Sequence, residues 1–480
     1  MPLTAVAFWL LYVSGTAAAV AAPLIGVLLY VLVYHMNPGT QWWGESVRAV
    51  GLRPALTVTI AIVIGLAIRF PRFDGVGRQF SAPLVWGLLL TLYGLVSMSW
   101  GYGVNPRGIF VGTKVLKVMI FLMILVRCVR RPEHYQLVII AWLAGVLYLG
   151  YQALGRVGVQ EQGRLAYGVG GPDFAESSGL AVHLVATLPL IGAMFFMARR
   201  WWSRSLLLIV GALAVNTIVL TRTRNAIVGI AAVTLVTAPL LPRGHRLKGW
   251  FAIMIGAVLA FQLCDPGWWR RMTTISAYRE DASAVRRLAY WRAAFEMSMD
   301  HPFGIGLGNF HEVVKEYVPG LKFRRSAHST YFQCLADLGW PGFFLLAAMI
   351  GSVLGRLNRI QRLAEQHQPF VQMRILGRNG RFHIAWHAVG LRAALCGYLA
   401  CGIFTTRLWA EGFWILVGLV CALENVTAYV LSRQRLPAEQ RHGPLAWLEA
   451  SAPGSSGSSL PLPAGPADPW AERPHVGPAP

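Results

Sequence analysis

Six residues in the polar segments between long apolar runs could bind a polyanion and move a proton. Five of them are arginines and one is a histidine. The arginines are Arg164, Arg222, Arg224, Arg286 and Arg287, and the histidine is His328. Guanidinium groups bind phosphate oxygens in pairs, and an imidazole exchanges a proton near neutral pH. Each arginine alone is better explained by contact with lipid phosphate or a helix C-terminus, so the interpretation depends on the whole set.

The composition indicates where these residues must act. Of 480 residues, 55% are hydrophobic and only 13% are charged, and the mean hydropathy is +0.50. An ordinary globular domain carries roughly 25% charged residues. So few charges cannot cover a water-soluble surface of this size, which excludes a soluble enzyme and predicts a membrane protein. The six cysteines have no metal-binding spacing and are typical of small buried apolar residues.

The apolar runs predict an all-α, polytopic membrane protein with about twelve transmembrane helices, since each span needs about 20 apolar residues. The predicted spans are 5–34, 54–69, 82–99, 109–127, 134–154, 175–198, 205–221, 226–241, 249–264, 331–354, 385–404 and 411–431. The first run is long and contains Pro23, so it is either one span or a tight hairpin, which would give thirteen.

The chain has 43 Lys and Arg against 21 Asp and Glu, a formal charge of +22. A nucleic-acid partner is not predicted, because most of the excess lies in short tracts between apolar runs. With twelve spans these tracts all fall on one side, which the positive-inside rule makes cytoplasmic, together with both termini. The sequence predicts about nine spans in 1–264, followed by a large periplasmic loop in 265–330 that contains an amphipathic helix at 282–299. About three further spans lie in 331–431, with a basic cytoplasmic loop at 355–384. A disordered Pro/Gly/Ser-rich cytoplasmic tail follows at 432–480.

Two strings near the end of the large loop carry a family resemblance. HPFGIGLGNF (301–310) is a Gly-rich turn, and AHSTYFQCLADLGWPGF (327–343) leads into the next span. In the second string a small polar residue follows His328, an acidic residue lies nine positions after it at Asp337, and glycine lies eleven after it at Gly339. This pattern resembles the hallmark of the O-antigen ligase and O-antigen polymerase superfamily, although Asn and Glu are more usual in that family where Ser329 and Asp337 stand here.

Three further strings resemble elements of the same family. LTRTRNA aligns the family's arginine with Arg224. VRRLAYW resembles a second arginine-containing element of the family, whose arginine aligns with Arg287 or, as the alternative, with Arg286. GRLAYGVGGPDFA resembles a third such element and contains Arg164. The resemblance extends over residues 160–345. The N-terminal third and the basic loop more loosely resemble putative O-glycosylation ligases found beside exosortase systems.

The resemblance implies a glycosyltransferase in the bacterial inner membrane with its active site facing the periplasm. The implied donor is a glycan on polyprenyl (undecaprenyl) diphosphate, and the acceptor is lipid A–core, another glycan or a protein hydroxyl. Transfer in this family is regarded as inverting and independent of metal, with no cofactor. We expect His328 to accept the hydroxyl proton and Arg224 and Arg287 to stabilise the leaving diphosphate. We expect Arg164, Arg222 and Arg286 to bind or border that diphosphate.

Several alternatives remain at this stage. The motifs do not separate a ligase from a polymerase, and a flippase or transporter for the same lipid-linked glycan would also need many spans and outward arginines. Taken alone, His328 is explained as a cap of the following span. Asp337 is expected to support the site or pack between helices, and Asp173 with Glu176 is expected to form a capping box at a span start.

Overall fold

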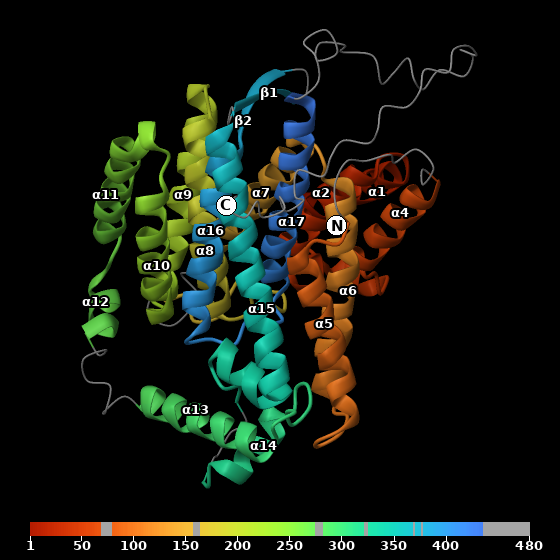
Figure 1. The fold of residues 1–480 in the computed structure, drawn as a ribbon, viewed down its shortest axis with the longest axis vertical. Coiled ribbons are helices and arrows are strands. Elements are labelled where there is room, and N and C mark those ends of the chain that lie inside the picture. The colour runs from red at the N-terminus through yellow and green to blue at the C-terminus, as the bar shows by residue number, and fades with distance from the viewer. Residues whose placement is uncertain are drawn as a thin grey trace, which may run out of the picture.

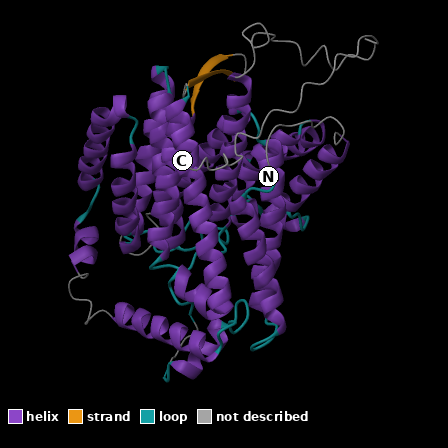
Figure 2. Ribbon diagram, viewed as in Figure 1, coloured by secondary structure: helices purple, strands orange, loops and turns teal. Residues whose placement is uncertain are grey.

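The structure is a computed structural model that describes residues 1–68, 79–156, 164–273, 282–320, 325–367, 370–375 and 378–434. Most of the described chain is helical (Figures 1 and 2). Residues 435–480, almost all of the tail predicted to be disordered, lie outside the described residues.

The described helices run mostly side by side in a bundle, and α13 lies across one end of it (Figure 1). Their bounds are α1 Leu3–Ala21, α2 Pro23–Met36, α3 Glu45–Ala49, α4 Pro54–Ile68, α5 Ala82–Val96, α6 Pro106–Cys128, α7 Pro132–Arg156, α8 Ser177–Met197, α9 Trp201–Thr221, α10 Arg224–Leu240, α11 Arg246–Gln262, α12 Pro266–Thr273, α13 Ala282–Asp300, α14 Phe310–Tyr317, α15 Thr330–Gln366, α16 Ile384–Gly402 and α17 Glu411–Gln434. Helix α16 packs extensively against α8 and α10, and α17 lies between α6 and α16.

The multi-pass, helical class predicted from the apolar runs is confirmed. In the described part of the chain, nine helices are long and apolar enough to cross a membrane, or ten if α11 and α12, bent by 102° at their junction, form one span. Helices α4 and α10, at 15 and 17 residues, are shorter than the roughly 20 residues that a bilayer needs. The structure therefore contains helices at the twelve predicted positions, but not all of them are long enough for a full crossing.

The first predicted span, 5–34, is a hairpin of two helices, which was the alternative considered for this run. The chain breaks before Pro23, which occupies the first position of α2, where its missing N–H leaves no bond unmade. A Cβ built on Gly15 would lie 3.0 Å from Cδ2 of Leu29. Those residues would be about 21 Å apart in one straight helix. Helix α1 therefore folds back along α2.

The basic segment 355–384 is not a simple loop, and the all-α prediction is wrong there. Helix α15 continues to Gln366, and two antiparallel strands follow it: β1, Phe370–Ile375, and β2, Arg378–His383. The buried side chains of Met373 and Phe382 hold this hairpin against the bundle, because strand alternation turns both of them inward.

The segment between α13 and α14 docks on a break in α15. Gly339 has a φ of 63°, which glycine tolerates, and a Cβ there would collide with the Pro302 carbonyl. The carbonyls that the break leaves free are used by the Gly-rich turn: the N–H of Ile305 donates to Ala336 at 3.1 Å, and the N–H of Gly306 donates to Asp337 at 2.9 Å. The two strings that carry the family resemblance thus pack directly on each other.

Candidate functional site

His328 lies immediately before α15 in a conformation that few residues adopt. Its φ is 50°, in the left-handed region that non-glycine residues adopt uncommonly, asparagine, aspartate and histidine more often than the others. Hydrogen bonds hold the preceding residue from two sides: Trp291 Nε1 donates to the Ala327 carbonyl at 3.0 Å, and the Ala327 N–H donates to Gln333 Oε1 at 2.9 Å. The helix cap is Ser329, whose hydroxyl accepts from Phe332. His328 is therefore not the cap of this helix.

The surroundings of His328 keep its ring neutral. Burial lowers the pKa of His328 below its usual 6.5, and the positive charge of Arg287 lowers it further. The charges of Arg325 and Arg407 act in the same direction, and the carboxylate of Glu176 opposes them. A neutral imidazole surrounded by cations can accept a proton, and the same cations can hold an anion beside it.

The two adjacent arginines of helix α13 lie in different surroundings. Arg287 is half-buried and acts electrostatically on His328, whereas Arg286 is exposed. Tyr290, on the same helix, has its ring 6.5 Å from that of His328, and Trp291 donates to the His328 segment. Helix α13 covers the predicted range 282–299, and it brings Arg287 rather than Arg286 close enough to act on the histidine.

The other three predicted arginines gather where α9 meets α10. Nε of Arg164 donates to the last carbonyl of α9 at 3.4 Å. Arg222 forms an ion pair with Asp265, at the junction of α11 and α12. Nε of Arg224, the first residue of α10, donates to the Arg271 carbonyl of α12 at 3.3 Å. The predicted site residues thus fall into two groups, one around His328 and one at the α9–α10 turn.

The end of α16 connects these two groups. Cys401 Sγ donates to the Asn225 carbonyl at 3.3 Å, at the start of α10. After α16, the Thr406 hydroxyl donates to the Ser329 carbonyl at 3.4 Å, and the Arg407 N–H donates to Thr330 Oγ1 at 3.0 Å. The segment 403–410 therefore lies against the start of α15, directly after His328.

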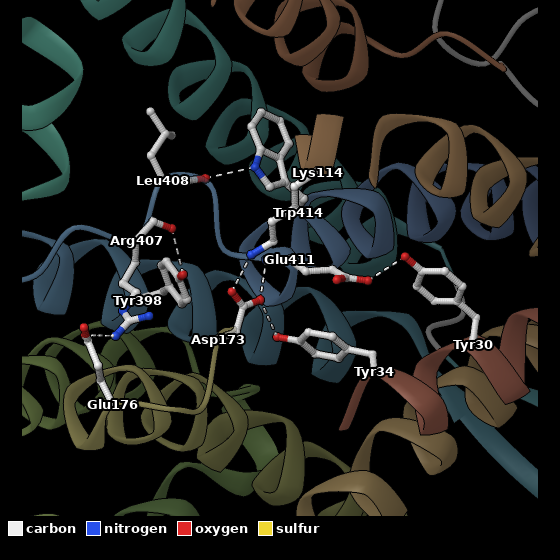
Figure 3. Close-up of polar contacts among 10 residues, drawn as sticks. All are labelled: Tyr30, Tyr34, Lys114, Asp173, Glu176, Tyr398, Arg407, Leu408, Glu411 and Trp414. Atoms are coloured by element: carbon white, nitrogen blue, oxygen red, sulfur yellow. Dashed lines mark hydrogen bonds and ion pairs between the residues drawn. The ribbon is translucent and has the colours of Figure 1, made fainter. Parts of the chain in front are cut away.

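Sequence reasoning missed Arg407 and Glu176. Nη2 of Arg407 pairs with Oε2 of Glu176 at 2.7 Å (Figure 3). The signal was present in the sequence, because Arg407 lies between two apolar runs on the side predicted to be periplasmic, where the positive-inside rule disfavours arginine. That rule had drawn attention to the other arginines.

A second histidine was also missed. His311 in α14 interacts electrostatically with His328, and burial, then Arg107 and then His328, lower its pKa to about 4. His311 is therefore neutral at physiological pH and adds no positive charge to the site.

Asp337 supports the Gly-rich turn. Its Oδ1 accepts from the Phe310 N–H at 3.0 Å, and its Oδ2 accepts from Gln333 Nε2 at 2.9 Å. Gln333 in turn accepts from the Ala327 N–H. Asp337 thus links the start of α14 to the His328 segment without facing the histidine itself.

The capping box predicted for Asp173 and Glu176 is wrong. Glu176 is the N-cap of α8, yet no side chain caps that helix. Asp173 is buried and instead accepts from Lys114 Nζ at 2.6 Å, from the Tyr34 hydroxyl at 3.2 Å and from the Glu411 N–H at 2.7 Å (Figure 3). Both carboxylates therefore bind elements that are distant in sequence, which fixes segment 173–176 against α6 and the start of α17.

We expect Asp173→Ala to lower the free energy of unfolding by about 3–5 kcal/mol, because it leaves the Lys114 ammonium enclosed without its carboxylate. Thermal unfolding of the purified protein in detergent measures this loss. Adding Lys114→Met to Asp173→Ala should recover part of it, because the second substitution removes the uncompensated charge. Equal unfolding temperatures for wild type and Asp173→Ala would contradict the prediction.

Fold and site together define a multi-pass helical membrane protein that gathers several arginines around a neutral histidine outside its spans. Residues 209–347 match the model of the O-antigen ligase family. The match confirms that this part of the chain resembles the O-antigen ligase and polymerase superfamily. No curated protein matches the chain significantly.

The matched domain contains Arg222, Arg224, Arg287 and His328, whereas Arg164, Glu176 and Arg407 lie outside it. Among the residues that the structure describes, no group of three or more His, Cys, Asp or Glu side chains could hold a metal ion.

Proposed function

We propose that this protein transfers a glycan from a polyprenyl diphosphate carrier to an acceptor hydroxyl, as an O-antigen ligase does. The observation that carries the proposal is His328: a neutral imidazole, in a left-handed backbone conformation, with Arg287 beside it. Backbone strain of this kind is concentrated at functional sites. A general base and a diphosphate-stabilising cation are the two groups that this transfer requires.

In the proposed reaction the acceptor oxygen attacks the anomeric carbon of the donor sugar, and the bond from that carbon to the diphosphate oxygen breaks. His328 takes the hydroxyl proton, and the departing polyprenyl diphosphate keeps the bonding electron pair. Arg287 and Arg224 stabilise the negative charge that builds on the bridging oxygen. One displacement of this kind inverts the configuration at the anomeric carbon, and its charge balance requires no metal ion.

The remaining arginines suit the rest of the donor headgroup. Arg164 and Arg222, at the α9–α10 turn, are proposed to bind the outer phosphate oxygens, with Arg286 at the exposed edge.

We infer that this end of the bundle faces the periplasm from the bacterial inner membrane, because the basic tracts occur in the connections at the other end. The end of α17 then lies on the cytoplasmic side. The N-terminal hairpin changes the expectation for the other terminus: folding α1 back along α2 reverses the cytoplasmic N-terminus that a single first span had predicted.

The test uses purified protein in lipid, with chelator and without added metal. A polyprenyl diphosphate oligosaccharide is added with lipid A–core, glycan or protein acceptors in turn, and release of polyprenyl diphosphate is followed. Release that depends on one acceptor supports the transferase and identifies that acceptor. A second glycan as the preferred acceptor would identify a polymerase. No release with any acceptor, combined with donor movement between vesicle leaflets, would identify a flippase instead.

The acid limb of the pH profile provides a further prediction. Since burial and Arg287 disfavour the protonated ring, neutral His328 persists below pH 6.5. The midpoint of the acid limb of kcat/KM is therefore expected to lie below pH 6.5, because it follows the lowered pKa of His328. Initial rates of polyprenyl diphosphate release across a pH series measure this limb. A decline that begins well above pH 6.5 would contradict the assignment.

A further inference from the structure

Arg407 and Glu176 form an ion pair beside the His328 segment, and the reaction described above does not use it. The two side chains differ sharply in exposure: 10% for Arg407 and 75% for Glu176 (Figure 3). Leaving Arg407 would cost Glu176 little, because its exposed carboxylate is readily hydrated. The carboxylate of this pair can therefore be exchanged for another anion.

The backbone of Arg407 is fixed on two sides. Its N–H donates to Thr330 Oγ1 at 3.0 Å, and its carbonyl accepts from the Tyr398 hydroxyl at 3.0 Å. Its guanidinium also reaches the hydroxyl of Ser178 at 3.4 Å. The charge of this guanidinium lowers the pKa of His328, as that of Arg287 does. Arg407 is thus a preorganised cation of segment 403–410 that acts on the same histidine as Arg287 of α13.

We propose that Arg407 is a diphosphate-binding residue of the site and that Glu176 is the counterion that the donor's diphosphate displaces. This inference rests on the function proposed above. A diphosphate carries more charge than a carboxylate and offers several oxygens to the planar guanidinium, so it competes effectively for Arg407. The diphosphate is then held between cations of α13 and of segment 403–410, and the second of these lies outside the matched domain.

Two substitutions have opposite expected effects, and a purely structural role of the ion pair cannot produce that result. Arg407→Ala should weaken binding of farnesyl diphosphate about ten- to hundredfold, because a charge-assisted hydrogen bond is lost. Glu176→Gln should strengthen the same binding about two- to fivefold, because the diphosphate no longer competes with a carboxylate. Isothermal titration of the full-length protein in lipid nanodiscs gives both dissociation constants, with farnesol as the probe for the prenyl tail alone.

Arg292 and Glu296 supply matched controls, because they form an exposed i,i+4 pair on α13 at 2.8 Å. Arg292→Ala and Glu296→Gln should leave farnesyl diphosphate binding unchanged. Arg407→Lys should retain part of the affinity for farnesyl diphosphate, since lysine keeps the positive charge but lacks the planar guanidinium that binds two oxygens at once. Weaker binding in Glu176→Gln, or unchanged binding in Arg407→Ala, would overturn the inference.

The same variants separate this inference from the proposed function. If wild type releases polyprenyl diphosphate and Arg407→Ala does so with an unaltered donor KM, the transferase stands and only the role of Arg407 fails. If wild type neither releases polyprenyl diphosphate nor binds farnesyl diphosphate more tightly than farnesol, the proposed function fails as well.

Discussion

Replacing His328 with asparagine is expected to lower kcat for glycan transfer by about 10²–10⁴-fold, while the KM for the donor stays near its wild-type value. The loss follows from the missing general base, whose contribution to such reactions is of this size. Asparagine is the appropriate substitution because residue 328 has a φ of 50° and asparagine tolerates that region. Release of polyprenyl diphosphate at saturating donor measures kcat.

Alanine at the same position provides the comparison. Histidine and asparagine occur in the left-handed region several times more often than most other non-glycine residues, so His328→Ala should lose some stability as well as rate. If asparagine and alanine reduce kcat equally but only alanine lowers the unfolding temperature, the rate loss belongs to the imidazole. If His328→Asn retains kcat, His328 is not the base.

The second large effect is expected for Arg287. Arg287→Ala should lower kcat by about 10²–10³-fold, the usual consequence of losing one preorganised group that stabilises developing charge. Arg286→Ala should lower kcat far less than Arg287→Ala does, because Arg286 is exposed at the edge of the proposed site and Arg287 is the neighbour that acts on His328. Parallel single-turnover rates with one donor and acceptor pair compare the two variants.

The pH profile adds an independent check on Arg287. Because its charge helps to lower the pKa of His328, Arg287→Ala should move the acid limb of kcat/KM upward, toward pH 6.5. The limb in Arg286→Ala should stay where it is in wild type. The reverse ranking, with activity lost in Arg286→Ala and kept in Arg287→Ala, would mean that the alignment of this helix is wrong by one residue.

The sequence alone predicted the features that depend on short stretches of chain. Apolar runs identify membrane helices because every backbone polar group in a bilayer must be satisfied within its own helix, which makes length and hydropathy sufficient. The pattern from His328 to Gly339 is equally local, and it identified the family that the domain match confirms. The break at Pro23 was recognisable, although the run by itself allowed either a single span or a hairpin.

The tertiary structure decided which charges act together. Arg286 and Arg287 are neighbours in sequence, and only the rotation of α13 against the His328 segment distinguishes them. Asp173 and Glu176 resembled a local cap, yet they bind Lys114 and Arg407, the latter 231 residues away along the chain. Periodicity and spacing report neighbours within one helix, whereas an electrostatic site forms where several helices meet. For this protein, the chain order determines the helices and the motif, and helix packing determines which cations surround His328.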